Sequence, residues 1–192
     1  MSMQQCLYPL FAYFLGSIPF GLIFSELFGS GGLREKGSKN IGSTNVLRTQ
    51  GKLLGALTLI CDFSKAFIPC YFFDSGDLIC NLLILVAPTI GHMFPIWLKF
   101  KGGKGVATFL GTIGAISWAV LLGAGLIWMA VFAVCRISSV SCLIAVSCSL
   151  LLYRYVQNDI FVMSALIFLV ILIFIKHKDN LIRLHNNQEK RL

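Results

Sequence analysis

Long apolar runs constrain this chain more than any other feature of its sequence. A membrane-spanning helix needs roughly 20 mostly apolar residues, and 57% of the chain is hydrophobic while only 12% is charged. Six runs approach or exceed that length: about Tyr8 to Phe28, Leu53 to Phe73, Leu78 to Leu98, Val106 to Cys135, Val140 to Tyr153 and Ile160 to Ile175. The composition excludes an ordinary soluble domain. It predicts one all-α polytopic membrane domain over residues 1–192.

The fourth run is 30 residues long, so it is either one tilted helix or two short helices broken near Gly114, Ser117 and Trp118. Cytoplasmic loops carry an excess of Lys and Arg, and this rule separates the two cases. With two helices the chain has seven spans, and 14 of the 16 basic residues fall on one face. A six-span arrangement would place the basic tail outside with Arg136. We therefore expect seven transmembrane helices, with the N-terminus outside and the C-terminus in the cytoplasm.

The net charge of +8 requires no nucleic acid, because orientation in the membrane and anionic lipid headgroups account for it. The seven cysteines are odd in number and include no C-x-x-C pair. Neither a disulfide framework nor a zinc site is indicated. No metal and no cofactor is expected, and membrane lipids are expected partners.

The first polar motif is GSKNIGSTNVLR, from Gly37 to Arg48. It combines hydroxyl and amide donors with the bidentate guanidinium of Arg48, which suits phosphate or carboxylate. The simpler alternative is a polar loop whose Ser, Thr and Asn residues cap the following helix. A cap needs only one such residue, so a binding role is favoured.

The second polar motif places Lys104 among three glycines. Glycine reaches positive φ freely, so backbone N–H groups at Gly102, Gly103 and Gly105 could turn toward one anion, to which Lys104 adds a positive charge. The alternative is a flexible basic turn between two spans. A Walker A loop is excluded, because Lys104 is followed by glycine and Leu98 occupies the position of the leading glycine.

The tail from Lys176 reads KHKDNLIRLHNNQEKRL. A short interfacial helix there would present His177 and Asn180 on one side. With an unperturbed pKa near 6.5, His177 could accept a proton at cytoplasmic pH. Anchoring at the lipid headgroups is the simpler interpretation of this basic segment.

Three ionisable residues fall inside apolar runs: Glu26, Asp62 and Lys65. Charges in the hydrocarbon region are costly and are functional candidates. Asp62 and Lys65 are three positions apart on one helix face, so a structural ion pair is the favoured interpretation and an ion or proton relay the alternative.

With these motifs located, the chain resembles the bacterial acyl-phosphate-dependent glycerol-3-phosphate acyltransferases, the PlsY family. The resemblance covers nearly the whole sequence and rests on four segments: GSIPFG at Gly16 to Gly21, GSKNIGSTNVLR at Gly37 to Arg48, GHMFP…FKGGKGVAT at Gly91 to Thr108, and KHKDNLIRL at Lys176 to Leu184. It implies seven membrane helices in the bacterial inner membrane. It also implies an active site on the cytoplasmic side and transfer of an acyl group from acyl phosphate to the sn-1 hydroxyl of glycerol 3-phosphate.

Carried over by position, the resemblance implies catalytic roles for Ser38, Arg48, Lys104, His177 and Asn180. Substrate-binding roles are implied for Gly37, Asn40, Gly42, Thr44, Asn45, Gly102, Gly103, Gly105 and Ser141. A structural role is implied for Glu189. The implied products are lysophosphatidic acid and phosphate, and a monomer is expected.

The chain departs from the family pattern at a few positions. Lys39 stands where the family has glycine, Ser43 where it has alanine, and Ala66 where it has glycine. The H-x-x-x-x-D signature of enzymes that use acyl-CoA is missing, which favours acyl phosphate as the donor.

Both expected substrates carry phosphate, and one carries an acyl chain, so cationic loops and an apolar slot between helices are required. Acyl phosphate is already activated, so the hypothesis is direct attack by the glycerol hydroxyl. Either His177 or a phosphate oxygen of a substrate takes the proton. The rival classes are a small transporter, for which we find no internal repeat, and a scaffold without chemistry.

Overall fold

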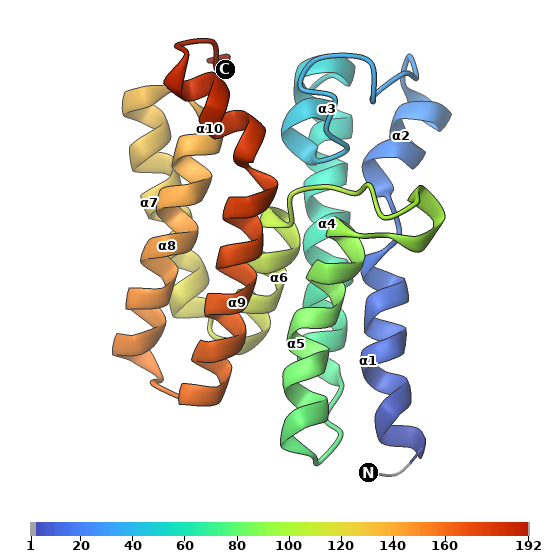
Figure 1. Ribbon diagram of the computed structural model, residues 1–192, viewed down its shortest axis with the longest axis vertical. Coiled ribbons are helices and arrows are strands. Elements are labelled where there is room, and N and C mark those ends of the chain that lie inside the picture. Colours follow the sequence, from blue (N-terminus) through green and yellow to red (C-terminus); the bar gives the residue numbers. More distant parts are fainter. Residues whose placement is uncertain (1–2, 192) are drawn as a thin grey trace. The chain divides into compact units, whose positions relative to one another are not determined.

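The computed structural model describes residues 3–191, and this part of the chain is helical without any strand (Figure 1). The elements in order are α1 (Met3–Gly16), α2 (Phe20–Phe28), α3 (Ser43–Gln50), α4 (Lys52–Phe72), α5 (Leu78–Met93), the 3-10 turn η1 (Ile96–Leu98), α6 (Val106–Ile116), α7 (Trp118–Cys135), α8 (Ser138–Val156), α9 (Ile160–Lys176) and α10 (Lys178–His185). The predicted all-α class is confirmed.

Five segments are long and apolar enough to cross a bilayer: Leu7–Phe28, Lys52–Phe72, Leu78–Leu98, Trp118–Cys135 and Ser138–Val156. A sixth follows if α9 and α10, bent by 53° at His177, count as one span. At 11 residues, α6 rises about 16 Å, roughly half of a typical hydrocarbon core.

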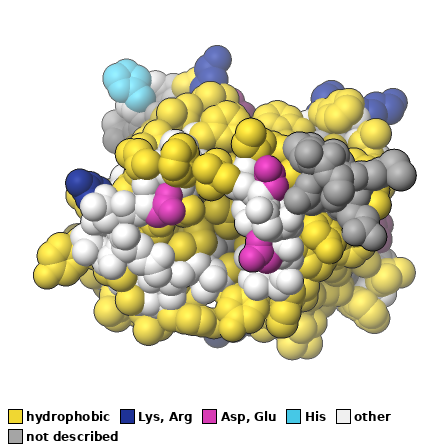
Figure 2. Space-filling view, turned by 90° about the horizontal axis from the view of Figure 1, so that it is seen from below, with side chains coloured by type: hydrophobic (Ala, Val, Ile, Leu, Met, Phe, Trp, Pro, Cys, Tyr) yellow, Lys and Arg dark blue, Asp and Glu magenta, His cyan; other side chains and the backbone are white. Residues whose placement is uncertain are grey.

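The surfaces of the apolar helices support placement in a membrane. Large hydrophobic side chains face outward on several of them, including Ile60 at 59% exposure, Leu122 at 65% and Ile171 at 54%. The outward-facing hydrophobic side chains on the sides of these helices match lipid better than water. Figure 2 shows the molecule from below, so the lower ends of the helices are in view, with acidic side chains among polar groups and hydrophobic side chains around them.

The 30-residue run is broken where the sequence indicated. Helix α6 ends at Ile116, and Ser117 adopts an extended conformation as the N-cap of α7, where its hydroxyl accepts from the amide of Val120. The first run also divides, because α1 ends at Gly16 and α2 begins at Phe20, after Pro19. Proline lacks an amide hydrogen, so an unbroken helix through this position is disfavoured.

The chain forms two compact units that divide between Ala115 and Ile116. In the first unit, α1 packs closely against α5 (Figure 1). A Cβ on Gly16 would meet the backbone of Pro88, and one on Gly91 would meet the carbonyl of Tyr13. Small residues therefore set the helix separation, as expected for membrane helices.

In the same unit, α3 lies on the first turns of α4, where a Cβ on Gly55 would meet Leu47. Because Ser43 and Thr44 fall inside α3, and α4 begins after Gly51 without a side-chain cap, the capping interpretation of this motif is wrong. The motif builds its own helix instead.

The second unit contains α7 to α10, and its main contacts are between α7 and α8 and between α8 and α9. The indole N–H of Trp128 on α7 donates to the sulfur of Cys142 on α8 over 3.3 Å. Asp159 caps α9 by accepting from the amides of Phe161 and Val162. Helix α10 follows α9 directly after His177 and ends at His185, so the described part of the tail beyond it is not helical (Figure 1).

Candidate functional site

Asn45 holds the first polar motif together. Its side chain is buried, and its carbonyl oxygen accepts from the amide of Ser38 at 2.8 Å. Its NH2 group donates to the carbonyls of Asn40 at 2.8 Å and of Leu33 and Lys36 at 3.2 Å each. The hydrogen-bonding capacity of this amide is therefore spent on the loop before α3. Sequence reasoning placed Asn45 among the substrate donors, but the structure gives it the role of fixing Ser38 and Asn40.

Two loop residues beside Asn45 have left-handed backbone conformations. Gly37 has φ +63°, and a Cβ there would also meet the amide oxygen of Asn45. Lys39 has φ 59°, a region that glycine adopts without strain. Glycine, the residue that the family resemblance implies at position 39, would adopt this backbone without strain.

The remaining residues of this motif lie in α3 and in the loop before it. Ser38 and Asn40 are half-buried in that loop, and Gly42 is the N-cap of α3. Thr44 is half-buried in the first turn of the helix and Arg48 in its last turn. The hydroxyl, amide and guanidinium groups therefore occur on one loop and the short helix that follows it.

The glycine loop folds back onto the end of α5. The amide of Gly102 donates to the carbonyl of Met93 at 3.1 Å, and the amide of Gly103 donates to the carbonyl of His92 at 3.0 Å. These bonds satisfy carbonyls that the end of a helix leaves unpaired. The expected cradle of successive glycine N–H groups is therefore wrong for Gly102 and Gly103, whose amides bond to protein.

Close packing is what requires glycine in this loop. A Cβ on Gly102 would meet the carbonyl of His92, and one on Gly103 would meet its imidazole ring. Gly105 has φ +86°, and a Cβ there would meet Met93. Lys104 is half-buried. Because Gly103 and Gly105 on either side of it pack against α5, the backbone of Lys104 is held in place from both sides.

The two polar loops of the first unit are joined directly. Arg34 Nη2 donates to the carbonyl of Lys101 at 2.7 Å. Beneath them, Leu98 packs against an apolar cluster formed by Leu33, Ile41, Val46 and Leu54. The segment that bears Arg48 and the segment that bears Lys104 therefore meet at one end of this unit.

A buried charged cluster lies below the glycine loop. Lys65 Nζ is 2.7 Å from Asp62 Oδ1, 3.0 Å from His92 Nδ1 and 2.7 Å from the carbonyl oxygen of Ile18. All three ionisable side chains are almost completely buried. The predicted Asp62–Lys65 ion pair is confirmed. His92 as its third member was missed, because it lies 27 positions from Lys65 in sequence.

In the second unit, His177 lies between α9 and α10 and is buried. Its Nδ1 is 2.8 Å from the carbonyl of Ile173. Because a carbonyl can only accept, Nδ1 carries a proton, and a neutral ring keeps its lone pair on Nε2. The structure thus fixes the tautomer that a base acting through Nε2 requires.

Glu189 ties the tail to α8. It accepts from the hydroxyl of Ser139 at 2.8 Å, from the side-chain amide of Asn180, and from Nε of Arg183 at 2.8 Å. Burial would raise the pKa of Glu189, but the hydrogen bonds from Asn180, Ser139 and Arg183 outweigh it and leave that pKa below its ordinary value. The carboxylate orients Asn180, which agrees with the structural role expected for Glu189.

Two serines of α8 differ in role. Ser141 is buried, and its hydroxyl donates to the carbonyl of Ile137 within its own helix. Ser139 makes the contact with the tail and was missed, since nothing in its spacing separates it from neighbouring serines.

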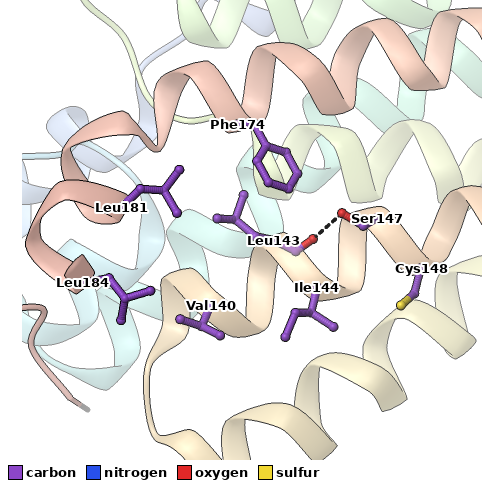
Figure 3. Close-up of a pocket in the computed structure, with 8 residues that line it drawn as sticks. All are labelled: Val140, Leu143, Ile144, Ser147, Cys148, Phe174, Leu181 and Leu184. Carbon is purple, nitrogen blue, oxygen red and sulfur yellow. Dashed lines mark hydrogen bonds between the residues drawn. The ribbon is translucent and has the colours of Figure 1, made fainter.

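An apolar pocket of about 300 Å³ lies between α8, α9 and α10. Figure 3 shows Phe174, Leu181 and Leu184 turned toward α8 across it. Its other walls are Val140, Leu143, Ile144 and Cys148, together with Ser147, whose hydroxyl donates to the carbonyl of Leu143. The lining offers shape and apolar surface for a hydrocarbon chain.

These features define a helical membrane protein with cationic, hydroxyl-bearing loops at helix ends and an apolar pocket between helices. The model of the family described as glycerol-3-phosphate acyltransferase matches residues 6–187. The chain belongs to this family.

Bacterial proteins named glycerol-3-phosphate acyltransferase are similar to this chain over most of its length. The glycerol-3-phosphate acyltransferase of Dinoroseobacter shibae is 46% identical over 185 residues, which cover 94% of this chain and 89% of that protein. The one from a Wolbachia of Brugia malayi is 40% identical over 195 residues, covering 98% and 99%. The expected family and the acyltransferase class of enzyme are confirmed.

Two solved structures are similar along almost the whole chain. One is PlsY, an integral membrane glycerol 3-phosphate acyltransferase, in its glycerol 3-phosphate form, with TM-score 0.93, 35% identity, and coverage of 98% of this chain and 96% of that one. The other is its lysophosphatidic acid form, with TM-score 0.90, 34% identity, and coverage of 98% and 95%. The predicted integral membrane class is confirmed.

Proposed function

We propose that this enzyme transfers a fatty acyl group from acyl phosphate to the sn-1 hydroxyl of glycerol 3-phosphate. The products are lysophosphatidic acid and inorganic phosphate. The observation that supports it most is the bond from Arg34 to Lys101. It joins the loop that bears Ser38 and leads into α3, the helix of Arg48, to the loop that bears Lys104. We assign phosphate binding to Arg48 and Lys104 at this end of the membrane-embedded unit.

Recognition is assigned to charge and donors. Arg48 offers a planar fork that matches phosphate oxygens, and Lys104 offers a compact ammonium. Ser38 and Asn180 orient the substrates, and both are held in place by partners, Asn45 and Glu189 respectively. Such support lowers the entropy lost when ligands bind.

The reaction is a direct displacement. The hydroxyl oxygen of glycerol 3-phosphate forms an ester bond to the acyl carbon, and the bond from that carbon to the phosphate oxygen breaks. The proton of the hydroxyl passes to Nε2 of His177. The hydrogen bond from Nδ1 to the carbonyl of Ile173 keeps the ring proton on Nδ1, so Nε2 has the lone pair that accepts. A phosphate oxygen of a substrate is the alternative acceptor. Charge that develops on the leaving phosphate is stabilised by the cationic side chains.

The pocket between α8, α9 and α10 is assigned to the acyl chain. Leu181 and Leu184, which line it, lie on the same short helix as Asn180. A chain seated there would therefore end near a residue proposed to orient the reacting groups.

For the topology we propose seven spans, with α1 and α2 as one and α6 as a short seventh member. The N-terminus is then outside, the C-terminus and the active site face the cytoplasm, and the protein lies in the bacterial inner membrane as a monomer. The excess of basic residues on one set of loops supports this orientation. Labelling of single cysteines introduced near residues 40, 103 and 180 tests it, because all three should react only from the cytoplasmic side.

The decisive assay uses purified enzyme with synthetic palmitoyl phosphate. Phosphate release should require glycerol 3-phosphate, and the product should carry its ester at sn-1. Palmitoyl-CoA in place of palmitoyl phosphate should give no product. Transfer from acyl-CoA alone would refute the donor. Absence of any transfer, with movement of glycerol 3-phosphate into sealed vesicles, would instead support a transporter.

A further inference from the structure

The buried cluster of Asp62, Lys65 and His92 carries an inference beyond the proposed activity. We propose that it is a positioning device for Lys104, acting through the glycine loop. The three side chains are 1%, 2% and 4% exposed, and none of them is assigned contact with substrate. The proposal rests on the proposed function, in which Lys104 binds a phosphate.

The ammonium of Lys65 fixes the orientation of His92. Its three partners are Asp62 Oδ1, the carbonyl of Ile18 and His92 Nδ1, at 2.7 to 3.0 Å. An ammonium only donates, so Nδ1 of His92 accepts and the proton of the neutral ring is on Nε2. A protonated His92 would place two cations 3.0 Å apart, with one carboxylate, Asp62 Oδ1, at 3.6 Å from Nδ1, and burial disfavours the excess positive charge.

The other side of the ring supports the loop. A Cβ on Gly103 would meet Nε2, Cε1 and Cδ2 of His92, so this glycine rests directly on the imidazole. The carbonyl of His92 also accepts from the amide of Gly103 at 3.0 Å. The ring and backbone of one residue therefore hold the residue immediately before Lys104.

The cluster also ties this support to the break between α1 and α2. Lys65 reaches the carbonyl of Ile18, and Trp97 Nε1 donates to the carbonyl of Ser17 at 2.7 Å. Both carbonyls belong to residues that lie between the two helices. Helices α4 and α5 and the α1–α2 junction thus share one buried polar centre beneath the loop.

A simple structural ion pair would affect stability alone, whereas a positioning device must affect substrate affinity. The first test compares the double variant D62N/K65M with T58V in enzyme purified in detergent. The double variant removes both charges at nearly constant volume, so no lone charge is left buried. Thr58 is a matched control, since it is also buried on α4, and its hydroxyl donates to the carbonyl of Leu54 within its own helix.

We expect D62N/K65M to lower kcat/KM for glycerol 3-phosphate by about 10- to 100-fold, as small misplacements of binding groups do. A higher KM should account for most of this loss, with a smaller fall in kcat because Lys104 also stabilises the leaving phosphate. T58V should leave both constants unchanged. An unchanged KM in a folded double variant would overturn the proposal. Wild-type enzyme inactive with palmitoyl phosphate would instead refute the proposed function.

The second test does not depend on the folding of the double variant. G103A places a methyl group against the ring, and H92A removes the ring. G103A should raise the KM for glycerol 3-phosphate by some factor in wild type. If His92 positions the loop by contact, this factor should be at least threefold smaller in the H92A background. If the KM of the double variant equals the product of the two single effects to within twofold, the proposal is overturned.

Discussion

The guanidinium of Arg34 donates a 2.7 Å hydrogen bond to the carbonyl of Lys101, joining loops whose residues are 67 positions apart. Exposed contacts of this kind contribute about 1 kcal/mol. We predict that R34A raises the KM for glycerol 3-phosphate roughly fivefold and lowers the thermal midpoint in detergent by about 2–4 °C. R154A is the control, because Arg154 is also exposed but lies at the end of α8. Equal effects of the two variants would contradict this prediction.

Asn45 supplies both a donor and an acceptor to the loop before α3. In N45D the carboxylate can still accept from Ser38, but it faces the carbonyls of Leu33, Lys36 and Asn40 without any hydrogen to give them. We predict a loss of about 3 kcal/mol in the free energy of unfolding, together with loss of activity.

Thermal unfolding and initial rates check this prediction. T49V is the matched control, since the hydroxyl of Thr49 donates only to the backbone carbonyl of Asn45 on the same helix. A stable, active N45D would show that the loop does not depend on this amide.

The backbone at Lys39 predicts a stabilising substitution. A left-handed conformation costs a non-glycine residue about 1–2 kcal/mol, and glycine loses about 0.5–1 kcal/mol more than alanine to chain entropy. K39G should therefore stabilise the protein by about 0.5–1 kcal/mol, seen as a higher thermal midpoint. K39A removes the same charge without relieving the backbone, so it should give no gain. Equal midpoints for the two variants would refute the explanation.

Glu189 predicts a pH dependence in the tail. Its pKa in the folded protein is below the ordinary value of 4.5, because hydrogen bonds to its carboxylate outweigh burial. A depressed pKa contributes stability above the unfolded value, and this contribution is lost as pH falls through the folded value. Wild type should therefore melt higher than E189Q at pH 7, and the difference should shrink as pH falls below about 4.5. S147A, which removes a hydroxyl bonded within α8, should show no such convergence.

Local patterns predicted the helices and one ion pair, because these depend on neighbours along the chain. The pairing of Asp62 with Lys65 follows from short-range spacing. Hydropathy located the possible break near Ser117, and the distribution of basic residues over the loops favoured it. The break at Pro19 was missed because the apolar run continues through it, although proline is a recognised interruption.

The sequence did not predict the hydrogen bonds between polar groups that lie far apart along the chain. The amides of Gly102 and Gly103 were expected to face an anion, but folding of the loop onto α5 gives them carbonyl partners. The contact of Ser139 with Glu189 spans 50 positions. Periodicity within one helix contains no information about such a partner.

His177 gives the sharpest test of the chemistry. Its Nδ1 is committed to the carbonyl of Ile173, so we predict that the reaction proton passes to Nε2. H177Q should lower kcat by about 10²- to 10⁴-fold, the range typical of general base catalysis, with a smaller change in KM. H185Q is the control, because His185 is exposed at the end of α10, the helix that begins directly after His177. If H177Q keeps nearly wild-type kcat with palmitoyl phosphate, the histidine is not the base, and a phosphate oxygen of a substrate takes that role.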